Sequence, residues 1–290
     1  MKTSFPKKDI KIVLLEGIHP SAVEVFRGAG YSQIEHHEKA LPRAELFKAI
    51  TDAHIVGLRS RTQLDAEAIA HTRRLLAVGC FCIGTNQVDL RQTRELGVPV
   101  FNAPYSNTRS VAELVIAEAI LLMRRVPERN AECHRGGWAK SAEGSFEVRG
   151  KTLGIVGYGH IGTQIGVLAE SLGMHVLFHD IEAKLALGNA APARNLGDLL
   201  ARSDIVTLHV PQTPETAGMI GAGEIARMRR GAMLINASRG NVVEIEALAA
   251  ALRDHQLAGA AVDVFPKEPK GRDEEFVSPL REFDNVLLTP

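Results

Sequence analysis

The 290-residue sequence lacks an excess of charge of either sign, because 34 lysine and arginine residues balance 34 aspartate and glutamate residues. A balanced chain has no general attraction to nucleic acid or to an anionic membrane, so we expect neither as a partner. An anionic ligand would have to be bound by a local cluster of basic side chains.

Cysteines and long apolar runs are also scarce. The three cysteines are Cys80, Cys82 and Cys133, and Cys80-x-Cys82 is spaced too tightly for the usual zinc pair. We therefore expect reduced, buried or half-buried thiols and no metal site. No apolar run reaches the ~20 residues that span a bilayer, and the first residues lack the apolar core of a signal peptide. These absences predict a cytoplasmic protein without a membrane segment.

Two halves of alternating strand-like and helix-like segments are present, which favours two α/β domains with parallel sheets. The strands expected in the first half are residues 10–15, 54–58, 75–78 and 98–101, and the helices are 21–29, 43–50, 66–70 and 90–96. The strands expected in the second half are residues 152–157, 174–179, 205–209, 233–236, 258–263 and 286–288. Residues 111–125 are apolar on nearly every side and predict a buried helix, and the polar stretch 127–149 holds the only tryptophan, Trp138.

A glycine-rich turn is the most informative motif. Gly157-Tyr-Gly159-His-Ile-Gly162 follows an expected strand and precedes a helix-like segment. In such a turn the first glycine allows a tight bend, the second lets a diphosphate approach the backbone, and the third lets the helix pack on the strand. The diphosphate would lie at the helix N-terminus, where unpaired N–H groups favour negative charge.

Asp180 indicates which dinucleotide the turn would hold. It follows the next expected strand, 18 residues after Gly162. A carboxylate at this place accepts hydrogen bonds from the ribose hydroxyls and repels a 2′-phosphate. The pattern therefore predicts an NAD site.

Further motifs occur together with this turn. They are Arg59-Ser-Arg-Thr62, Gly79-Cys-Phe-Cys-Ile-Gly-Thr-Asn-Gln87, Phe101-Asn-Ala-Pro-Tyr-Ser-Asn-Thr-Arg-Ser-Val-Ala-Glu113, Ile235-Asn-Ala-Ser-Arg-Gly240 and Ala261-Val-Asp-Val-Phe265. Over essentially the whole chain the set resembles the D-isomer-specific 2-hydroxyacid dehydrogenases. Within this family the chain is most similar to bacterial members that oxidise D-3-phosphoglycerate to 3-phosphohydroxypyruvate, the first step of L-serine biosynthesis.

The resemblance implies a domain organisation. Residues 1–106 would form a substrate domain with a flavodoxin-like parallel sheet, and residues 107–290 a Rossmann-like NAD-binding domain inserted into it. The helix that returns to the substrate domain and the C-terminal regulatory domain of the bacterial members are absent from the sequence. The resemblance also implies a homodimer, in which the helix at 111–125 and the segment around Trp138 contact the partner's nucleotide domain.

The same resemblance implies which residues bind NAD. They come from the glycine turn, from Asp180 and from the ends of three later strands. The full set is Gly157, Gly159, His160, Ile161, Gly162, Asp180, His209, Val210, Pro211, Ala237, Ser238, Arg239 and Asp263.

An arginine, a glutamate and a histidine are the family's catalytic residues. Arg239 matches the arginine, whose forked donors can hold the substrate carboxylate and polarise its carbonyl. Glu268 matches the glutamate that orients the histidine and raises its basicity. The family's histidine directly follows a Leu-Leu-Thr-Pro segment, and the sequence ends at Thr289-Pro290. We therefore expect a fragment or truncated product that binds NAD well and turns it over slowly.

A local basic group points to the substrate. Arg59, Arg61 and Lys140 match positions that surround the substrate in the bacterial members, and Ser60 and Asn107 match polar neighbours. Two arginines that share one strand face would suit a small 2-hydroxy acid with both a phosphate and a carboxylate. Two alternatives remain open: a dehydrogenase for an unphosphorylated acid, and a non-catalytic NAD-binding scaffold.

Overall fold

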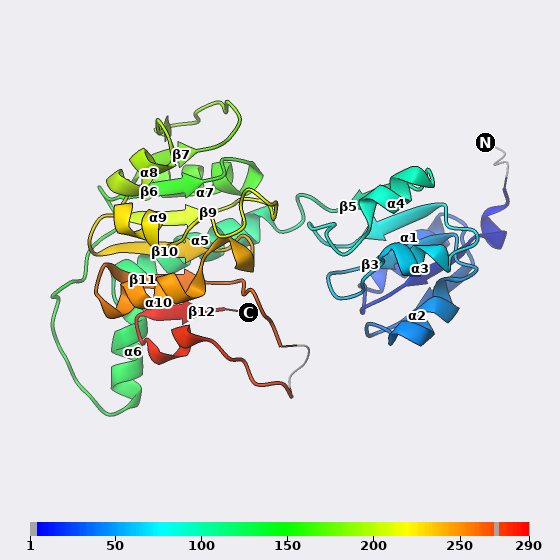
Figure 1. Ribbon diagram of the computed structural model, residues 1–290, viewed down its shortest axis with the longest axis horizontal. Helices are drawn as coiled ribbons and strands as arrows, with labels where there is room; N and C mark the ends of the chain where they lie inside the picture. The colour runs from blue at the N-terminus through cyan, green and yellow to red at the C-terminus, as the bar shows by residue number, and fades with distance from the viewer. Residues whose placement is uncertain (1–4, 270–272, 290) are drawn as a thin grey trace. The chain divides into compact units, whose positions relative to one another are not determined.

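The computed structural model describes residues 5–269 and 273–289, and its contacts divide the chain into two units, residues 1–107 and 108–290 (Figure 1). The boundary expected from the sequence, between residues 106 and 107, differs from this division by one residue. Each unit is an α/β structure built on its own sheet.

Unit 1 has a five-stranded parallel sheet. Its strands are β1 (Lys11–Leu14), β2 (Gln33–His36), β3 (Ile55–Leu58), β4 (Ala77–Cys80) and β5 (Val100–Asn102). They pair in the order β2-β1-β3-β4-β5, which is the flavodoxin-like order. The helix α1 (Ser21–Gly28) packs on one face, and α2 (Arg43–Ile50) and α3 (Ala66–Ala70) pack on the other. The short helices η1 (Lys7–Asp9) and α4 (Leu90–Glu95) complete the unit.

Unit 2 has a seven-stranded parallel sheet. Its strands are β6 (Thr152–Val156), β7 (His175–His179), β8 (Ala191–Pro192), β9 (Ile205–Leu208), β10 (Ala232–Asn236), β11 (Leu257–Val262) and β12 (Val286–Leu288). They pair in the order β12-β11-β10-β9-β6-β7-β8. Beginning at β6, the chain builds three strands in one direction and then returns to add the rest on the other side, as in a Rossmann sheet. The expected fold class, two α/β units with parallel sheets, is confirmed.

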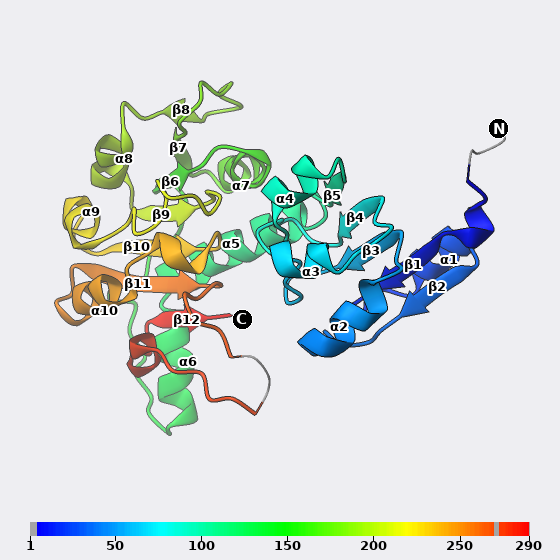
Figure 2. The same cartoon turned by 45° about the vertical axis from the view of Figure 1, so that its right-hand side comes forward.

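Helices cover both faces of the unit 2 sheet (Figure 2). The helices α5 (Thr108–Met123) and α7 (His160–Ser171) pack on one face, and α8 (Leu196–Arg202), α9 (Ala222–Arg227) and α10 (Ile245–Arg253) pack on the other. The helix α6 (Val126–His134) and the short helices η2 (Gly240–Val242) and η3 (Pro279–Glu282) lie in the connections. In the part of the chain that the structure describes, no helix is long and apolar enough to cross a membrane.

Some details differ from the expectations, and the two-residue strand β8 was not predicted. The strand β2 and the helix α6 were not predicted: β2 is a polar edge strand, and α6 has no buried residue. The helix expected at 111–125 is buried along one side only, since Glu113 and Ala117 are exposed. The thiol of Cys133 is exposed rather than buried or half-buried.

Candidate functional site

The glycine turn connects β6 to α7, and each of its glycines has a distinct steric role. Gly157 has φ +90°, and a Cβ added to it would lie 2.3 Å from the carbonyl oxygen of His209. A Cβ on Gly162 would lie 2.3 Å from the carbonyl oxygen of Gly157, because α7 packs directly against the turn. A Cβ on Gly159 would meet no atom within 4 Å. The first and third glycines are therefore required for packing, and the second leaves an open face.

Asp180 directly follows β7 and is held against this turn. One carboxylate oxygen accepts the N–H of Tyr158 at 2.8 Å, and the other accepts the N–H of Glu182 at 3.0 Å. Each oxygen keeps acceptor capacity beyond these bonds. The carboxylate is thus fixed next to the turn and can still accept hydrogen bonds from a ligand.

His209 follows β9 on the other side of the turn. Its Nε2 lies 2.8 Å from the hydroxyl of Thr207, and its Nδ1 is buried with no hydrogen-bond partner among residues 5–269 and 273–289. Burial lowers the pKa of His209 to about 3, so the imidazole is neutral at physiological pH. A neutral imidazole can line a binding site, but it provides no positive charge to bind an anion. Val210 and the exposed Pro211 continue the chain from this histidine.

Asn236 orders the segment after β10, which carries Ala237, Ser238 and Arg239. Its buried side-chain oxygen accepts the hydroxyl of Ser238 at 2.8 Å, and its amide donates to the carbonyl oxygen of Arg239 at 3.1 Å. The Arg239 guanidinium donates to the Ser238 carbonyl oxygen at 2.6 Å and has no ion-pair partner within the described ranges. Arg239 therefore keeps donors for an external carboxylate. Asn236 was not predicted from the sequence.

Carboxyl groups gather where β11 and β12 end. Asp263 follows β11, and burial, reinforced by the charge of Glu268, raises its pKa. Glu118 on α5 is 2% exposed; its Oε1 accepts the hydroxyl of Thr289 at 3.4 Å, and its Oε2 has no partner among the described residues. Burial, together with the charge of Asp263, raises the pKa of Glu118 to about 7. Glu268 itself is exposed in the loop after β11. Glu118 was not predicted from the sequence either.

Unit 1 holds two of the three basic residues expected to bind the substrate, Arg59 and Arg61. The prediction that Arg59 and Arg61 share a strand face is wrong, because β3 ends at Leu58 and both residues lie in the following loop. Both side chains are exposed, and neither guanidinium has an ion-pair partner in the described part of the chain. Ser60, between them, is also exposed, and Asn107 is the last residue of unit 1. Lys140 belongs to unit 2, where with Trp138 it lines a cavity of about 580 Å³.

These features of unit 2 fit a dinucleotide. The open face of Gly159 adjoins the N-terminus of α7, which no side chain caps, so its N–H groups favour an anion. The carboxylate of Asp180 and the backbone of His209 flank the same turn. His160 and Ile161 form the first turn of α7.

Comparison with known proteins agrees with this geometry. Residues 116–290 match the family model described as "D-isomer specific 2-hydroxyacid dehydrogenase, NAD binding domain". The chain is 60% identical over 289 residues to the D-3-phosphoglycerate dehydrogenase of Haemophilus influenzae, covering 100% of this chain and 70% of that protein. Two solved structures are similar over 96% of this chain. The TT0316 protein from Thermus thermophilus has a TM-score of 0.84 and 33% identity, with 88% of that chain covered. The D-lactate dehydrogenase from Aquifex aeolicus, complexed with NAD and lactic acid, has a TM-score of 0.82 and 25% identity, with 87% covered.

Proposed function

The chain belongs to the family of D-isomer specific 2-hydroxyacid dehydrogenases, and we propose that it oxidises D-3-phosphoglycerate to 3-phosphohydroxypyruvate with NAD, the first step of L-serine biosynthesis. The observation that carries this proposal is the 60% identity over the whole chain to a D-3-phosphoglycerate dehydrogenase. The guanidiniums of Arg59 and Arg61 support it, because they have no ion-pair partner among the described residues and the phosphate of such an acid would supply the opposite charge.

Unit 2 supplies the NAD site. The turn Gly157–Gly162 and the N-terminus of α7 would hold the diphosphate, and Asp180 would accept the ribose hydroxyls. The ends of the later strands would line the nicotinamide half through His209, Val210, Pro211, Ala237, Ser238 and Asp263. When bound, NAD accepts the hydride from C2 of the substrate.

Two side chains would act on the substrate. Arg239 would bind its carboxylate and polarise the C2 oxygen through donors that no acidic side chain of residues 5–269 and 273–289 occupies. Glu268 is the acidic partner expected for the acid–base histidine of the family. In unit 1, Arg59 and Arg61 would bind the phosphate, with Ser60 and Asn107 as polar neighbours. A role of Lys140, in unit 2, in substrate binding stays a prediction of the resemblance.

Substrate preference tests the proposal directly. We expect NADH formation with D-3-phosphoglycerate at a kcat/KM about a hundredfold above that with D-lactate or D-glycerate, because the unphosphorylated acids lose the charged hydrogen bonds to two arginines. NADP in place of NAD should bind more weakly, since its 2′-phosphate meets the carboxylate of Asp180. A clear preference for an unphosphorylated acid would exclude the phosphoglycerate assignment.

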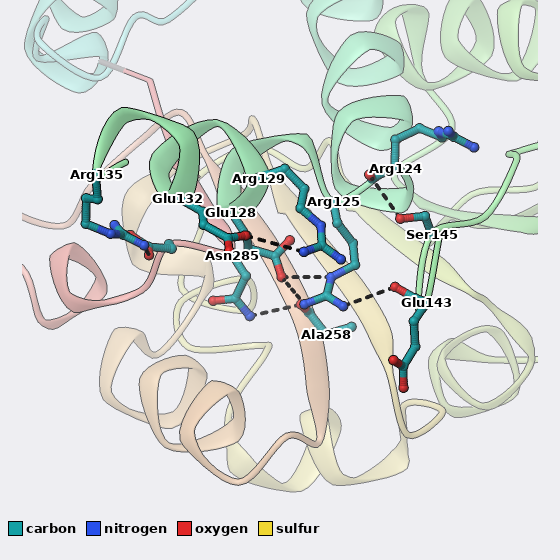
Figure 3. A network of polar contacts seen from close by, with 11 residues as sticks. Arg124, Arg125, Glu128, Arg129, Glu132, Arg135, Glu143, Ser145, Ala258 and Asn285 are labelled. Carbon is teal, nitrogen blue, oxygen red and sulfur yellow. Dashed lines mark hydrogen bonds and ion pairs between the residues drawn. The ribbon is translucent and has the colours of Figure 1, made fainter. Parts of the chain in front are cut away.

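A homodimer through unit 2 is also proposed. Trp138 is 83% exposed, and the exposed Val126 and Phe146 lie on either side of it in the chain. The helix α6 lines a cavity of about 850 Å³ together with residues at the start of β10 and β11 and just before β12. Figure 3 shows the polar contacts that hold the side chains of α6 there. Among them, Arg125 donates to Glu128 at 2.8 Å and Arg129 to Glu132 at 3.4 Å. Sedimentation that shows only a monomer at micromolar concentration would contradict the dimer.

We further propose a cytoplasmic location. Cys80, Cys82 and Cys133 are all free thiols, and thiols persist in a reducing compartment. Recovery of the protein from the periplasmic fraction of fractionated cells would contradict this location.

A further inference from the structure

Glu16 lies two residues after β1, at the carboxyl end of the strand next to β3. Its carboxylate accepts three backbone N–H groups from the loop that follows β3. Oε1 accepts from Arg59 at 3.2 Å and from Thr62 at 2.8 Å, and Oε2 accepts from Arg61 at 2.9 Å. Glu16 is 8% exposed and has φ +63°, a left-handed conformation that residues other than glycine rarely adopt. A buried, strained glutamate is therefore held in place by a loop that lies 43–46 residues away in the sequence.

These N–H donors stabilise the negative charge of the Glu16 carboxylate. Burial alone would raise the pKa of its carboxyl, but the hydrogen bonds from Thr62, Arg61 and Arg59 outweigh burial and lower the pKa below its ordinary value. The carboxylate is thus ionised at neutral pH.

Gln87 fixes the same loop from the other side. Its buried side-chain amide donates to the carbonyl oxygen of Arg59 at 2.7 Å and to that of Gly84 at 3.2 Å. Both backbone groups of Arg59 are therefore bound by buried side chains. The guanidiniums of Arg59 and Arg61, in contrast, have no ion-pair partner in the described residues.

In this loop the backbone N–H groups and the arginine side chains have different binding partners. Successive backbone N–H groups that point the same way form a site for an anion. Here the carboxylate of Glu16 occupies the backbone site. An external anion would therefore bind to the side chains of Arg59 and Arg61. Since the backbone is already ordered, binding does not have to order the loop as well.

We propose that Glu16 is a positioning residue for the substrate phosphate: its carboxylate fixes the backbone of residues 59–62 so that the guanidiniums of Arg59 and Arg61 are presented to the phosphate. The proposal rests on the proposed function for the identity of the substrate. In this role the carboxylate of Glu16, whose oxygens accept N–H groups of the loop, acts on the substrate through Arg59 and Arg61.

The substitution Glu16→Gln tests this role. A glutamine presents an amide NH₂ where the second carboxylate oxygen stood, so at least one loop N–H loses its acceptor. We expect the Kd for D-3-phosphoglycerate, measured by calorimetry, to rise about tenfold or more, and the Kd for NAD to stay unchanged because its site is in unit 2. Glu45→Gln, on an exposed face of α2, is the matched control and should change neither value.

A double-mutant cycle separates positioning from general damage to unit 1. If Glu16 acts through Arg59 and Arg61, then Glu16→Gln should add little to the loss of affinity that Arg59→Ala and Arg61→Ala together already cause. Additive losses would overturn the proposal, as would a Kd for D-3-phosphoglycerate that Glu16→Gln leaves unchanged.

Amide hydrogen exchange provides a readout that needs no substrate. In the unsubstituted protein the N–H groups of Arg59, Arg61 and Thr62 should be protected, and Glu16→Gln should expose them while β1 and β3 stay protected. Unchanged exchange at these three amides would overturn the positioning role alone. Absence of D-3-phosphoglycerate binding by the unsubstituted protein would instead overturn the proposed function, and with it the assignment of the anion.

Discussion

Gly159→Ala should abolish most of the NAD affinity and leave the fold intact, whereas Gly162→Ala should destabilise unit 2 itself. The added methyl group of Gly159→Ala meets no protein atom within 4 Å, so the folded chain accommodates it. It enters the space through which a diphosphate approaches the backbone, and we expect the NAD affinity to fall at least about tenfold. The methyl group of Gly162→Ala would lie 2.3 Å from the Gly157 carbonyl oxygen and must displace backbone, at a cost of about 3 kcal/mol or more.

Calorimetry distinguishes the two effects. NAD should raise the melting temperature of one transition in the unsubstituted protein, which identifies unit 2, because a ligand that binds only the folded state stabilises it. In Gly159→Ala this transition should keep its position without NAD and lose the shift with NAD; in Gly162→Ala it should move to lower temperature in both cases. Gly223→Ala, in the first turn of α9, also has nothing within 4 Å and serves as the control. A Gly159→Ala chain that binds NAD with unchanged affinity would refute the assigned role of the turn.

The glycine turn could be predicted from the sequence because its determinants are local. Three glycines and one strand–helix junction lie within six consecutive residues, and the steric reason for each glycine is a contact made at that junction or by the neighbouring strand end. Asp180 follows by the length of one helix and one strand. The positions of most strands along the chain could be predicted for the same reason, since buried parallel strands have apolar runs that stand out between polar connections.

The residues that support the site could not be predicted, because their partners are remote in the chain. The bonds of Glu16 span 43–46 residues, and the bond between Glu118 and Thr289 spans 171. A glutamate after a strand or within an apolar helix has the same sequence appearance whether it is exposed or buried. The polar strand β2 was missed because an edge strand needs no apolar run, and α6 because its support is a series of ion pairs rather than a buried face.

Glu118→Gln should flatten the pH dependence of the stability of unit 2. The carboxyl of Glu118 is 2% exposed, and its pKa rises from 4.5 to about 7 on folding, so the folded state favours the protonated form. Its contribution to stability is therefore fully present below pH 4.5 and is lost as the pH rises through 7. Integrated over this interval, the loss amounts to about 3 kcal/mol. Glutamine keeps the shape of the protonated acid and has no charge to lose.

The measurement is the unfolding free energy of the transition that NAD shifts, obtained by denaturant titration across the interval from pH 4.5 to above pH 7. The unsubstituted protein should lose stability with rising pH, and Glu118→Gln should retain it, apart from the smaller contribution of Asp263, whose pKa is also raised by burial. Glu113→Gln, one turn earlier on α5, is the matched control: its carboxylate is 60% exposed and pairs with Arg109, so it should shift the profile only slightly. Parallel profiles for Glu118→Gln and the unsubstituted protein would show that Glu118 does not bind the proton. Thr289 hydrogen-bonds Glu118 and lies beside Asp263, whose pKa is also raised. In that case Asp263 would be the carboxyl group that binds the proton.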